Sequence, residues 1–269
     1  MVSSILVHPP PHPSPSRGEG RTSCFLVCCQ KVRDARPMII SHTHKFIFIK
    51  TKKTAGTAIE AALSDLCGPE DVITPYRAES EEDRKGLPPQ NFRIEHPMKP
   101  KRPLWRKLLL RPERYYHQSV GYYEHRPASR VRAYVGEEIW RSYFKFAFDR
   151  NPWDRQVSWY FYKTKSKRFR PSFERFMRNR RRAYVDNYQL YTIEAEPALD
   201  FIGRYESLDE DLNKALQLAG VSRKIEVPRT NVGSDRDAAR DYHAMYNDET
   251  KALVAEWYQP EIKLLGYGF

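Results

Sequence analysis

The stretch FIFIKTKKTAGTAIEAAL, residues 46–63, decides the fold class. Its first part belongs to a short β-branched and aromatic run, Lys45–Lys50, and such runs are typical of β-strands. The loop TKKTAGT follows and leads into the N-terminus of an expected helix. Loops of this kind present unpaired backbone N–H groups that bind phosphate. The helix is expected over Ala58–Leu66, because four apolar residues share one helical face: Ile59, Ala62, Leu63 and Leu66.

Strands and helices continue to alternate along the rest of the chain. Proline is frequent in residues 69–116, where only a short helix over Trp105–Leu110 is expected. The alternation of the remaining elements predicts an α/β fold with a central parallel sheet flanked by helices. Those elements are a helix over Pro127–Tyr143, a strand over Tyr143–Phe148, a helix starting at Pro152, a strand over Asp200–Glu206, a helix from the N-cap Ser207 to Gly220, and a helix over Asn247–Tyr258.

The composition excludes several classes of protein. Of 269 residues, 40% are apolar, yet no run approaches 18 uninterrupted apolar residues, so no transmembrane helix is expected. Four cysteines are too few for a disulfide framework. The net charge of +12 is concentrated in Lys99–Ala183, which carries 24 basic and 7 acidic residues. This charge favours an anionic ligand, such as a nucleotide, a nucleic acid, an acidic glycan or an acidic membrane.

Residues 1–37 differ from the rest of the chain. They contain the stretch PPPHPSPSRGEGR. Such a segment buries too little apolar surface to offset the entropy lost on ordering, which is typical of segments without a fold. Three cysteines lie here, Cys24, Cys28 and Cys29, without a nearby Cys/His pair that would complete a zinc site. We therefore expect residues 1–37 to be a disordered or non-native extension before Met38. A single domain is expected over residues 38–269.

A second motif, FDRNPWDRQVSWY, spans Phe148–Tyr160. Arg150 stands at the end of an expected strand and Ser158 follows two helical turns later. A guanidinium offers a planar fork of donors to a phosphate, and a serine hydroxyl can add another. Considered alone, Ser158 also fits as a neutral helix residue and Arg155 as a surface charge. The first motif alone resembles a P-loop without its Gly-x-x-x-x-Gly-Lys-Ser/Thr order.

Together the two motifs resemble the nucleotide-binding motifs of sulfotransferases that use 3′-phosphoadenosine 5′-phosphosulfate (PAPS). The closest likeness is to the carbohydrate-type branch that includes heparan sulfate 2-O-sulfotransferase and bacterial relatives. KKTAGTA at Lys52–Ala58 is similar to the family's first motif, and FDRNPWDRQVSWY to its second. DFIGRYESL and the closing GYGF are similar to two further landmarks. The resemblance runs from about Lys45 to Phe269 and implies a P-loop-like three-layer fold.

The resemblance also implies the site. PAPS would be the co-substrate, with no metal required, and Lys53 would neutralise the leaving oxygen. Arg150 and Ser158 would hold the 3′-phosphate. The 5′-phosphosulfate would be bound, largely through backbone N–H groups, by Lys52, Lys53, Thr54, Ala55, Gly56, Thr57 and Ala58. Three positions of the two motifs depart from the family pattern: Lys52 replaces a proline, Ala58 a serine and Asp149 an apolar residue.

The acceptor hydroxyl needs a general base, and His125 is the first candidate. The carbohydrate branch has a histidine in a similar context, and a neutral imidazole accepts a proton near neutral pH. His117, His96 and Glu124 are the alternatives for this role.

The acceptor implied by the resemblance is a carbohydrate or another hydroxyl-bearing molecule, and the basic region suits an anionic one. No nucleic acid is expected as partner. Two other interpretations stay open: a P-loop-type nucleotide kinase, and a basic nucleic-acid-binding module, because aromatic and basic residues alternate over Arg111–Arg126. Golgi members of the family carry a membrane anchor, which this sequence lacks, so we expect a cytoplasmic bacterial protein.

Overall fold

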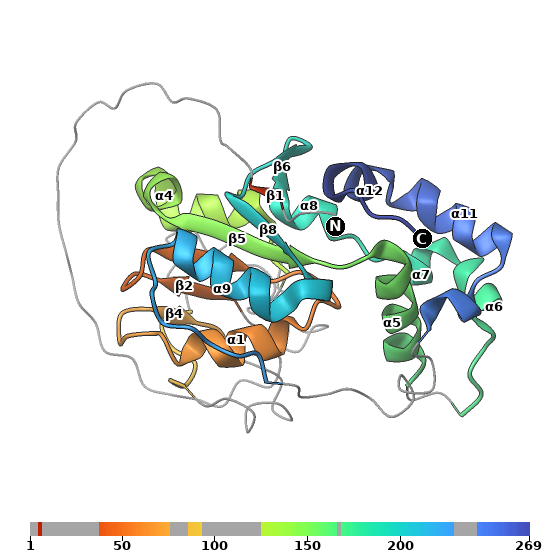
Figure 1. The fold of residues 1–269 in the computed structure, drawn as a ribbon, viewed down its shortest axis with the longest axis horizontal. Helices are drawn as coiled ribbons and strands as arrows, with labels where there is room; N and C mark the ends of the chain where they lie inside the picture. Colours follow the sequence, from red (N-terminus) through yellow and green to blue (C-terminus); the bar gives the residue numbers. More distant parts are fainter. Residues whose placement is uncertain (1–4, 7–37, 76–85, 93–124, 166–167, 229–240) are drawn as a thin grey trace, which may run out of the picture.

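A six-stranded sheet runs through the centre of the molecule (Figure 1). The computed structural model describes residues 5–6, 38–75, 86–92, 125–165, 168–228 and 241–269. Across the sheet the strand order is β1-β8-β5-β3-β2-β4. The strands are β1 (Ile5–Leu6), β2 (Ile39–Ser41), β3 (Phe46–Ile49), β4 (Val72–Ile73), β5 (Phe144–Asp149) and β8 (Phe201–Arg204).

The predicted parallel arrangement is confirmed for the three central strands. β3 pairs parallel with β5, and β5 pairs parallel with β8. The outer strands run antiparallel to their neighbours: β2 to β3, β4 to β2, and β1 to β8. β2 and β3 are joined by a turn of four residues, and so short a connection can join only antiparallel strands. The sheet is therefore mixed.

A buried carboxylate holds the turn between β2 and β3. Asp71 accepts hydrogen bonds from the backbone N–H groups of His42 (2.6 Å), Thr43 (3.0 Å) and Gly68 (2.9 Å), and from the hydroxyl of Ser41 (2.9 Å). Burial opposes the ionised form, but these hydrogen bonds outweigh it and lower the pKa of Asp71 below its ordinary value. The ionised Asp71 thus fixes the edge of the sheet.

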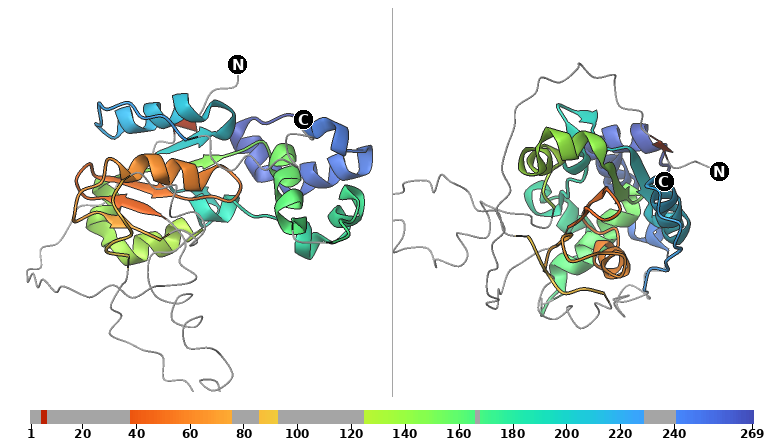
Figure 2. Two further views of the ribbon diagram at one scale, coloured as in Figure 1. Left: turned by 90° about the horizontal axis from the view of Figure 1, so that it is seen from below. Right: turned by 90° about the vertical axis from the view of Figure 1, so that its left-hand side faces the viewer.

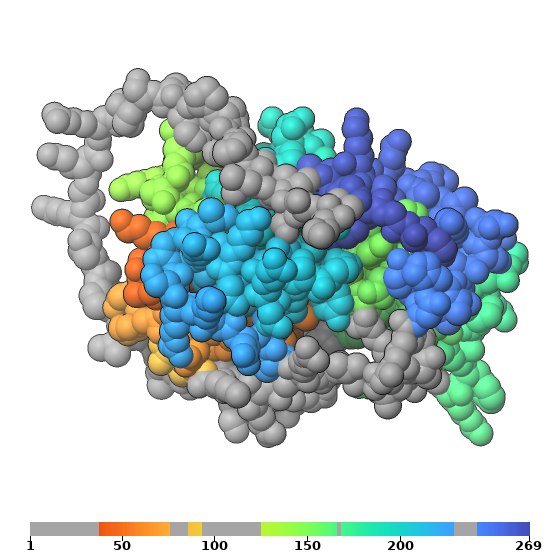
Figure 3. Space-filling view, in the orientation of Figure 1, coloured from red at the N-terminus to blue at the C-terminus, as the bar shows by residue number. Residues whose placement is uncertain are grey.

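Helices cover both faces of the sheet. Successive strand residues point to opposite sides, and because both sets are apolar, each face needs a covering layer. Phe46, Phe48, Phe146 and Phe148 face α1 (Gly56–Ser64) and α9 (Leu208–Leu218) in one apolar cluster. Figure 2 shows these two helices on the same side of the sheet, and in Figure 3 the side chains of α9 and residues 221–228 cover that side. Residues of alternate register, such as Ile47 and Ile49, pack into a second cluster with α4 (Ala128–Ser142).

The second apolar cluster extends beyond the sheet into a group of helices that follow β5 or close the chain (Figure 1). Trp153, Val157 and Tyr160 of α5 pack there with Val254 and Trp257 of α11. The elements of this part are α5 (Pro152–Thr164), α6 (Phe173–Met177), α7 (Arg180–Ala183), α8 (Tyr188–Tyr191), α11 (Asp248–Trp257), α12 (Gln259–Leu265), two 3-10 helices (Tyr205–Ser207 and Tyr242–Met245) and the small hairpin of β6 (Thr192–Ile193) and β7 (Glu196–Pro197).

Several helix ends differ from the sequence expectation for local reasons. α1 begins two residues earlier, at Gly56, after the left-handed N-cap Ala55. α4 has the predicted extent but is broken at Gly136, whose φ of 82° is not helical. Ser207 does precede α9, yet its hydroxyl donates to Asp211 (3.0 Å) and does not cap the helix. The helix expected over 105–110, and Cys24, Cys28 and Cys29, lie outside the described residues.

Candidate functional site

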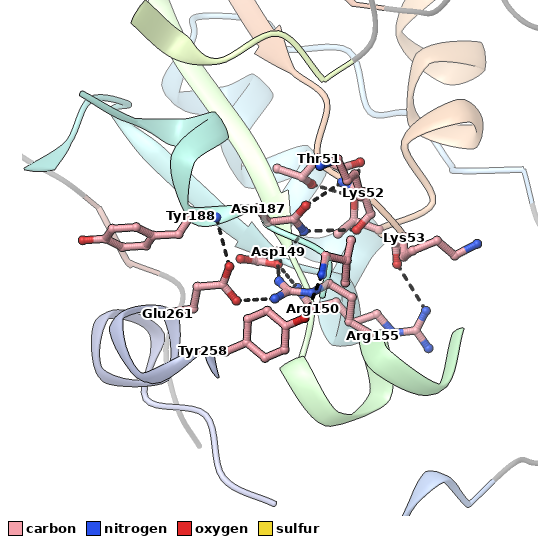
Figure 4. A network of polar contacts seen from close by, with 12 residues as sticks. Thr51, Lys52, Lys53, Asp149, Arg150, Arg155, Asn187, Tyr188, Tyr258 and Glu261 are labelled. Atoms are coloured by element: carbon pink, nitrogen blue, oxygen red, sulfur yellow. Dashed lines mark hydrogen bonds and ion pairs between the residues drawn. The ribbon is translucent and has the colours of Figure 1, made fainter. Parts of the chain in front are cut away.

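The two sequence motifs meet at one edge of the sheet (Figure 4). β3 ends at Ile49 and β5 at Asp149, and the carboxyl ends of neighbouring parallel strands lie side by side. The Thr51 hydroxyl donates to the carbonyl oxygen of Phe148. The Nη1 group of Arg150 donates to the carbonyl oxygen of Lys53 at 3.3 Å, across 97 residues of sequence. Loop and strand end therefore form one site.

The loop of the first motif has a folded backbone that depends on a glycine. Lys53 and Ala55 both adopt left-handed conformations, with φ of 65° and 57°. The buried ammonium of Lys50 lies beneath the loop and contacts the Thr57 hydroxyl at 3.0 Å and a Glu60 carboxylate oxygen at 3.1 Å. A Cβ at position 56 would lie 2.5 Å from the Cγ of Lys50, so only glycine allows this close approach.

The start of α1 offers a row of backbone donors. The N–H of Ala58 donates to the Ala55 carbonyl oxygen at 2.8 Å, and it is the first N–H group of this segment that has a backbone acceptor among the described residues. For the N–H groups of Thr54, Ala55, Gly56 and Thr57, no acceptor is found among the described residues. The helix dipole adds partial positive charge at the same place. This end of α1 can therefore bind an anionic group.

The threonine side chains of the loop are turned into the protein. The Thr54 hydroxyl lies 2.8 Å from that of Thr51, and the Thr57 hydroxyl accepts from Lys50. Both hydroxyls are therefore engaged in contacts within the protein.

The two predicted lysines point in different directions. The Lys53 ammonium lies 4.6 Å from the ring centroid of Tyr162, on the face of α5 that also carries Asp154 and Ser158 at four-residue intervals. The Lys52 ammonium donates to the carbonyl oxygen of Asp186 at 3.1 Å. Lys53 thus faces the second motif, whereas Lys52 faces the segment before α8.

Arg150 lies between the two motifs and is only 1% exposed. Its Nε donates to Asp154 at 2.7 Å, and its guanidinium stacks over the Tyr205 ring at 4.0 Å. Ser158 lies one turn beyond Asp154 on the same face of α5, and its hydroxyl has no hydrogen-bond partner among the described residues. The arrangement points a guanidinium and a hydroxyl to one side of α5.

His125 lies next to the end of β3, immediately before α4. Its Nδ1 is 3.1 Å from the carbonyl oxygen of Lys50. A carbonyl oxygen only accepts hydrogen bonds, so Nδ1 donates in this contact, which selects the tautomer with its lone pair on Nε2 when the ring is neutral. A histidine held in this tautomer can accept a proton at Nε2. The alternatives His96, His117 and Glu124 lie outside the described residues.

A buried polar network supports this site from below (Figure 4), and sequence reasoning missed most of it. Asp149 accepts hydrogen bonds from the Arg155 guanidinium (2.6 Å), the Asn187 amide (3.1 Å), the Tyr191 hydroxyl (2.9 Å) and the Arg150 backbone N–H (2.8 Å). The Arg155 side chain is fully buried, so it is not the surface charge that the residue considered alone would also fit. Four donors explain how a carboxylate replaces an apolar residue at position 149.

Arg155 also binds a second buried carboxyl, that of Glu261 on α12. Glu261 receives a further hydrogen bond from the Tyr188 N–H at 2.9 Å. Burial raises the pKa of Glu261 to about 8, although Arg155 acts in the opposite direction. Burial disfavours the charge on Arg155 too, but Glu261 and Asp149 hold its pKa well above the ordinary value. One cation is thus shared by two acids, far apart in sequence.

Comparisons with known proteins point to one family. A family model described as "Sulfotransferase family" matches residues 36–268. An uncharacterized protein of Archaeoglobus fulgidus is 35% identical over 113 residues, which cover 40% of this chain and 93% of that protein. No solved structure was found that matches the chain.

Among the described residues, no group of three or more His, Cys, Asp or Glu side chains is placed to hold a metal ion. Within the same part of the chain, no helix combines the length and apolar character needed to cross a membrane.

Proposed function

Because the chain belongs to the sulfotransferase family, we propose that it transfers a sulfuryl group from PAPS to a hydroxyl group of a carbohydrate acceptor. The observation that carries this proposal is the junction of the two motifs, where Arg150 donates to the Lys53 carbonyl. One nucleotide that carries phosphate groups on both the 3′ and the 5′ oxygen of its ribose fits such a junction. The helices on both faces of the sheet support a P-loop-like, three-layer assignment of the fold.

In the proposed reaction the acceptor oxygen attacks sulfur in line with the bond to the leaving phosphate oxygen. The new oxygen–sulfur bond forms as the old one breaks, and adenosine 3′,5′-bisphosphate leaves. Negative charge grows on the leaving oxygen, so a fixed cation and aligned N–H groups lower the barrier. Lys53 supplies the cation, and the N–H groups of Thr54–Thr57 supply the cradle. No metal takes part in this scheme.

The 3′-phosphate is the group that separates PAPS from ATP. We assign it to Arg150, which precedes α5 and bonds Asp154 of that helix, and to Ser158 on the same face of α5. The Nη1 and Nη2 groups of Arg150 each carry two N–H bonds, so the guanidinium can add a phosphate oxygen to its present partners, Asp154 and Lys53. The Ser158 hydroxyl adds a neutral donor one turn further along.

His125 is the proposed base. Its Nε2 receives the proton of the acceptor hydroxyl while the Lys50 carbonyl holds Nδ1–H. Lys50 directly precedes the donor loop, residues 51–57. This contact therefore holds the base beside the loop that would bind the donor.

The positive charge of the chain supports an anionic carbohydrate as the acceptor. The segment Lys99–Ala183, which contains His125 and the second motif, has 24 basic residues against 7 acidic ones. Exposed arginines on α6 and α7, such as Arg175 and Arg181, extend this charge beside α5. An anionic sugar polymer fits such a surface better than a neutral small alcohol does.

Nucleotide binding tests the proposal. In calorimetric titrations we expect adenosine 3′,5′-bisphosphate to bind at least ten times more tightly than adenosine 5′-phosphate or ATP. The variant Ser158→Ala should lose part of that preference, while Ser142→Ala, at the exposed end of α4, should keep it. Tighter binding of ATP would favour a kinase, and retention of DNA without nucleotide binding would favour a nucleic-acid-binding module.

A further inference from the structure

The Asn187 side chain lies between the two motifs (Figure 4). No motif in the sequence around Asn187 predicts this position. Its side chain is fully buried. The amide oxygen accepts the Lys52 N–H at 2.8 Å, and the amide nitrogen donates to the Lys52 carbonyl at 3.0 Å. The same nitrogen donates to Asp149 Oδ1 at 3.1 Å. One carboxamide thus pairs with the loop backbone as a neighbouring strand would, and also reaches the second motif.

The paired residue, Lys52, directly precedes the folded part of the donor loop. Lys53 has a φ of 65° and Ala55 a φ of 57°, and left-handed backbone is unfavourable for residues with a Cβ. Such conformations persist when the surroundings determine them. The two hydrogen bonds from Asn187 fix the peptide planes on both sides of Lys52, and so fix the direction in which the chain enters Lys53.

The Asp149 contact ties this loop to Arg150. Asp149 Oδ1 accepts from the Asn187 amide and from the Arg150 backbone N–H at 2.8 Å. The Arg155 guanidinium, at 2.6 Å from the same oxygen, neutralises the carboxylate. A single oxygen atom therefore joins the residue that holds the loop to the start of the second motif.

We propose that Asn187 is a positioning residue: it holds the donor loop against the second motif so that Lys53 and Arg150 address the same nucleotide. The identity of that nucleotide rests on the proposed function, whereas the holding of the loop does not. Asn187 does not contact the reacting atoms in this proposal, and it acts through the Lys52 backbone.

The test uses Asn187→Ala in the full chain, with Asn213→Ala as a matched control. Asn213 makes the same kind of amide pairing with one backbone residue: it accepts the Ile225 N–H at 2.9 Å and donates to the Ile225 carbonyl at 2.8 Å. It lies on α9, at the other side of the sheet. Both variants remove buried or half-buried hydrogen bonds, so both should melt at a lower temperature than the wild type.

Two readouts separate positioning from general stability. Hydrogen exchange of residues 51–57, measured well below the melting temperature, should accelerate in Asn187→Ala and not in Asn213→Ala. The dissociation constant for adenosine 3′,5′-bisphosphate should rise about 10-fold or more in Asn187→Ala only, as expected when several buried hydrogen bonds that shape a site are lost. If Asn187→Ala does not fold, Asn187→Ser serves in its place, because the shorter neutral side chain loses the amide pairing with Lys52 without adding a charge beside Asp149.

Unchanged exchange of residues 51–57 in the Asn187 variants overturns the proposal, whatever the nucleotide result. Accelerated exchange with an unchanged dissociation constant overturns it as well, because the loop would then be held for another reason. If the wild type does not bind the bisphosphate at all, the proposed function fails, and the exchange data still decide whether Asn187 holds the loop.

Discussion

Glu261 provides a prediction in which two physical effects have opposite signs. It shares the buried Arg155 with Asp149, and Asp149 has four donors whereas Glu261 has two. One buried cation cannot balance two buried carboxylates, so one acid should take up a proton, and Glu261 has the weaker support. Its pKa of about 8, against an ordinary 4.5, agrees with this reasoning.

A raised carboxyl pKa means that the folded protein binds more protons than the unfolded chain between those two values. The stability contributed by neutral Glu261 is therefore full below pH 4.5 and is lost as the pH rises through about 8. At about 1.4 kcal/mol per pKa unit, the loss is on the order of 3–5 kcal/mol. For a chain of this size that corresponds to roughly 6–20 °C in melting temperature.

The assay compares wild type with Glu261→Gln in urea titrations and thermal melts between pH 5 and 9. The glutamine keeps the shape and stays neutral, so the variant should lose less stability with rising pH, and the two curves should diverge between about pH 5 and 8 and run parallel above that. Curves that run parallel over the whole range would refute the reasoning. A wild type that gains stability over the variant as pH rises would show that the ion pair with Arg155 dominates.

Three further predictions follow from individual contacts. Lys53→Ala should lower kcat by about 10²-fold or more and weaken donor binding moderately. His125→Ala should lower kcat by roughly 10²- to 10⁴-fold and leave the donor dissociation constant within a few-fold. Steady-state kinetics measures the first effect and calorimetry the second. Gly56→Ala should destabilise the fold by about 1–3 kcal/mol in urea titrations, because the new methyl group collides with Lys50. The contribution of ionised Asp71 should be present at neutral pH and lost as pH falls below its ordinary pKa of 3.8. Asp71→Asn should therefore be less stable than wild type at pH 7, and the difference should shrink as the pH falls below 3.8.

The parts of the fold predicted best from the sequence are those encoded by short-range patterns. Phe46–Ile49 alternates bulky residues between the two faces of the sheet, and Pro152 fixes the first turn of α5. Ile39–Ser41 and Val72–Ile73 are too short to give a periodic pattern. They become strands because Asp71, which directly precedes Val72, binds the turn after Ser41, 30 residues earlier in the chain.

The candidate site shows the same division. Lys53, Gly56 and Arg150 lie in continuous motifs and could be identified from the chain alone. Asn187 and Glu261 could not, because each acquires its role from partners 135 and 106 residues away. Lys52 was expected beside the phosphosulfate, but its direction is set by the Asp186 carbonyl, which no local pattern reveals.

Transfer of sulfate from radiolabelled PAPS to a panel of glycans tests the central claim most directly. We expect the wild type to label an acceptor and to release an equal amount of adenosine 3′,5′-bisphosphate. The variants Lys53→Ala and His125→Ala should label it at least 10²-fold more slowly, and Asn213→Ala should match the wild type. Equal labelling by wild type and Lys53→Ala, or release of the bisphosphate without a labelled acceptor in any mixture, would contradict the account.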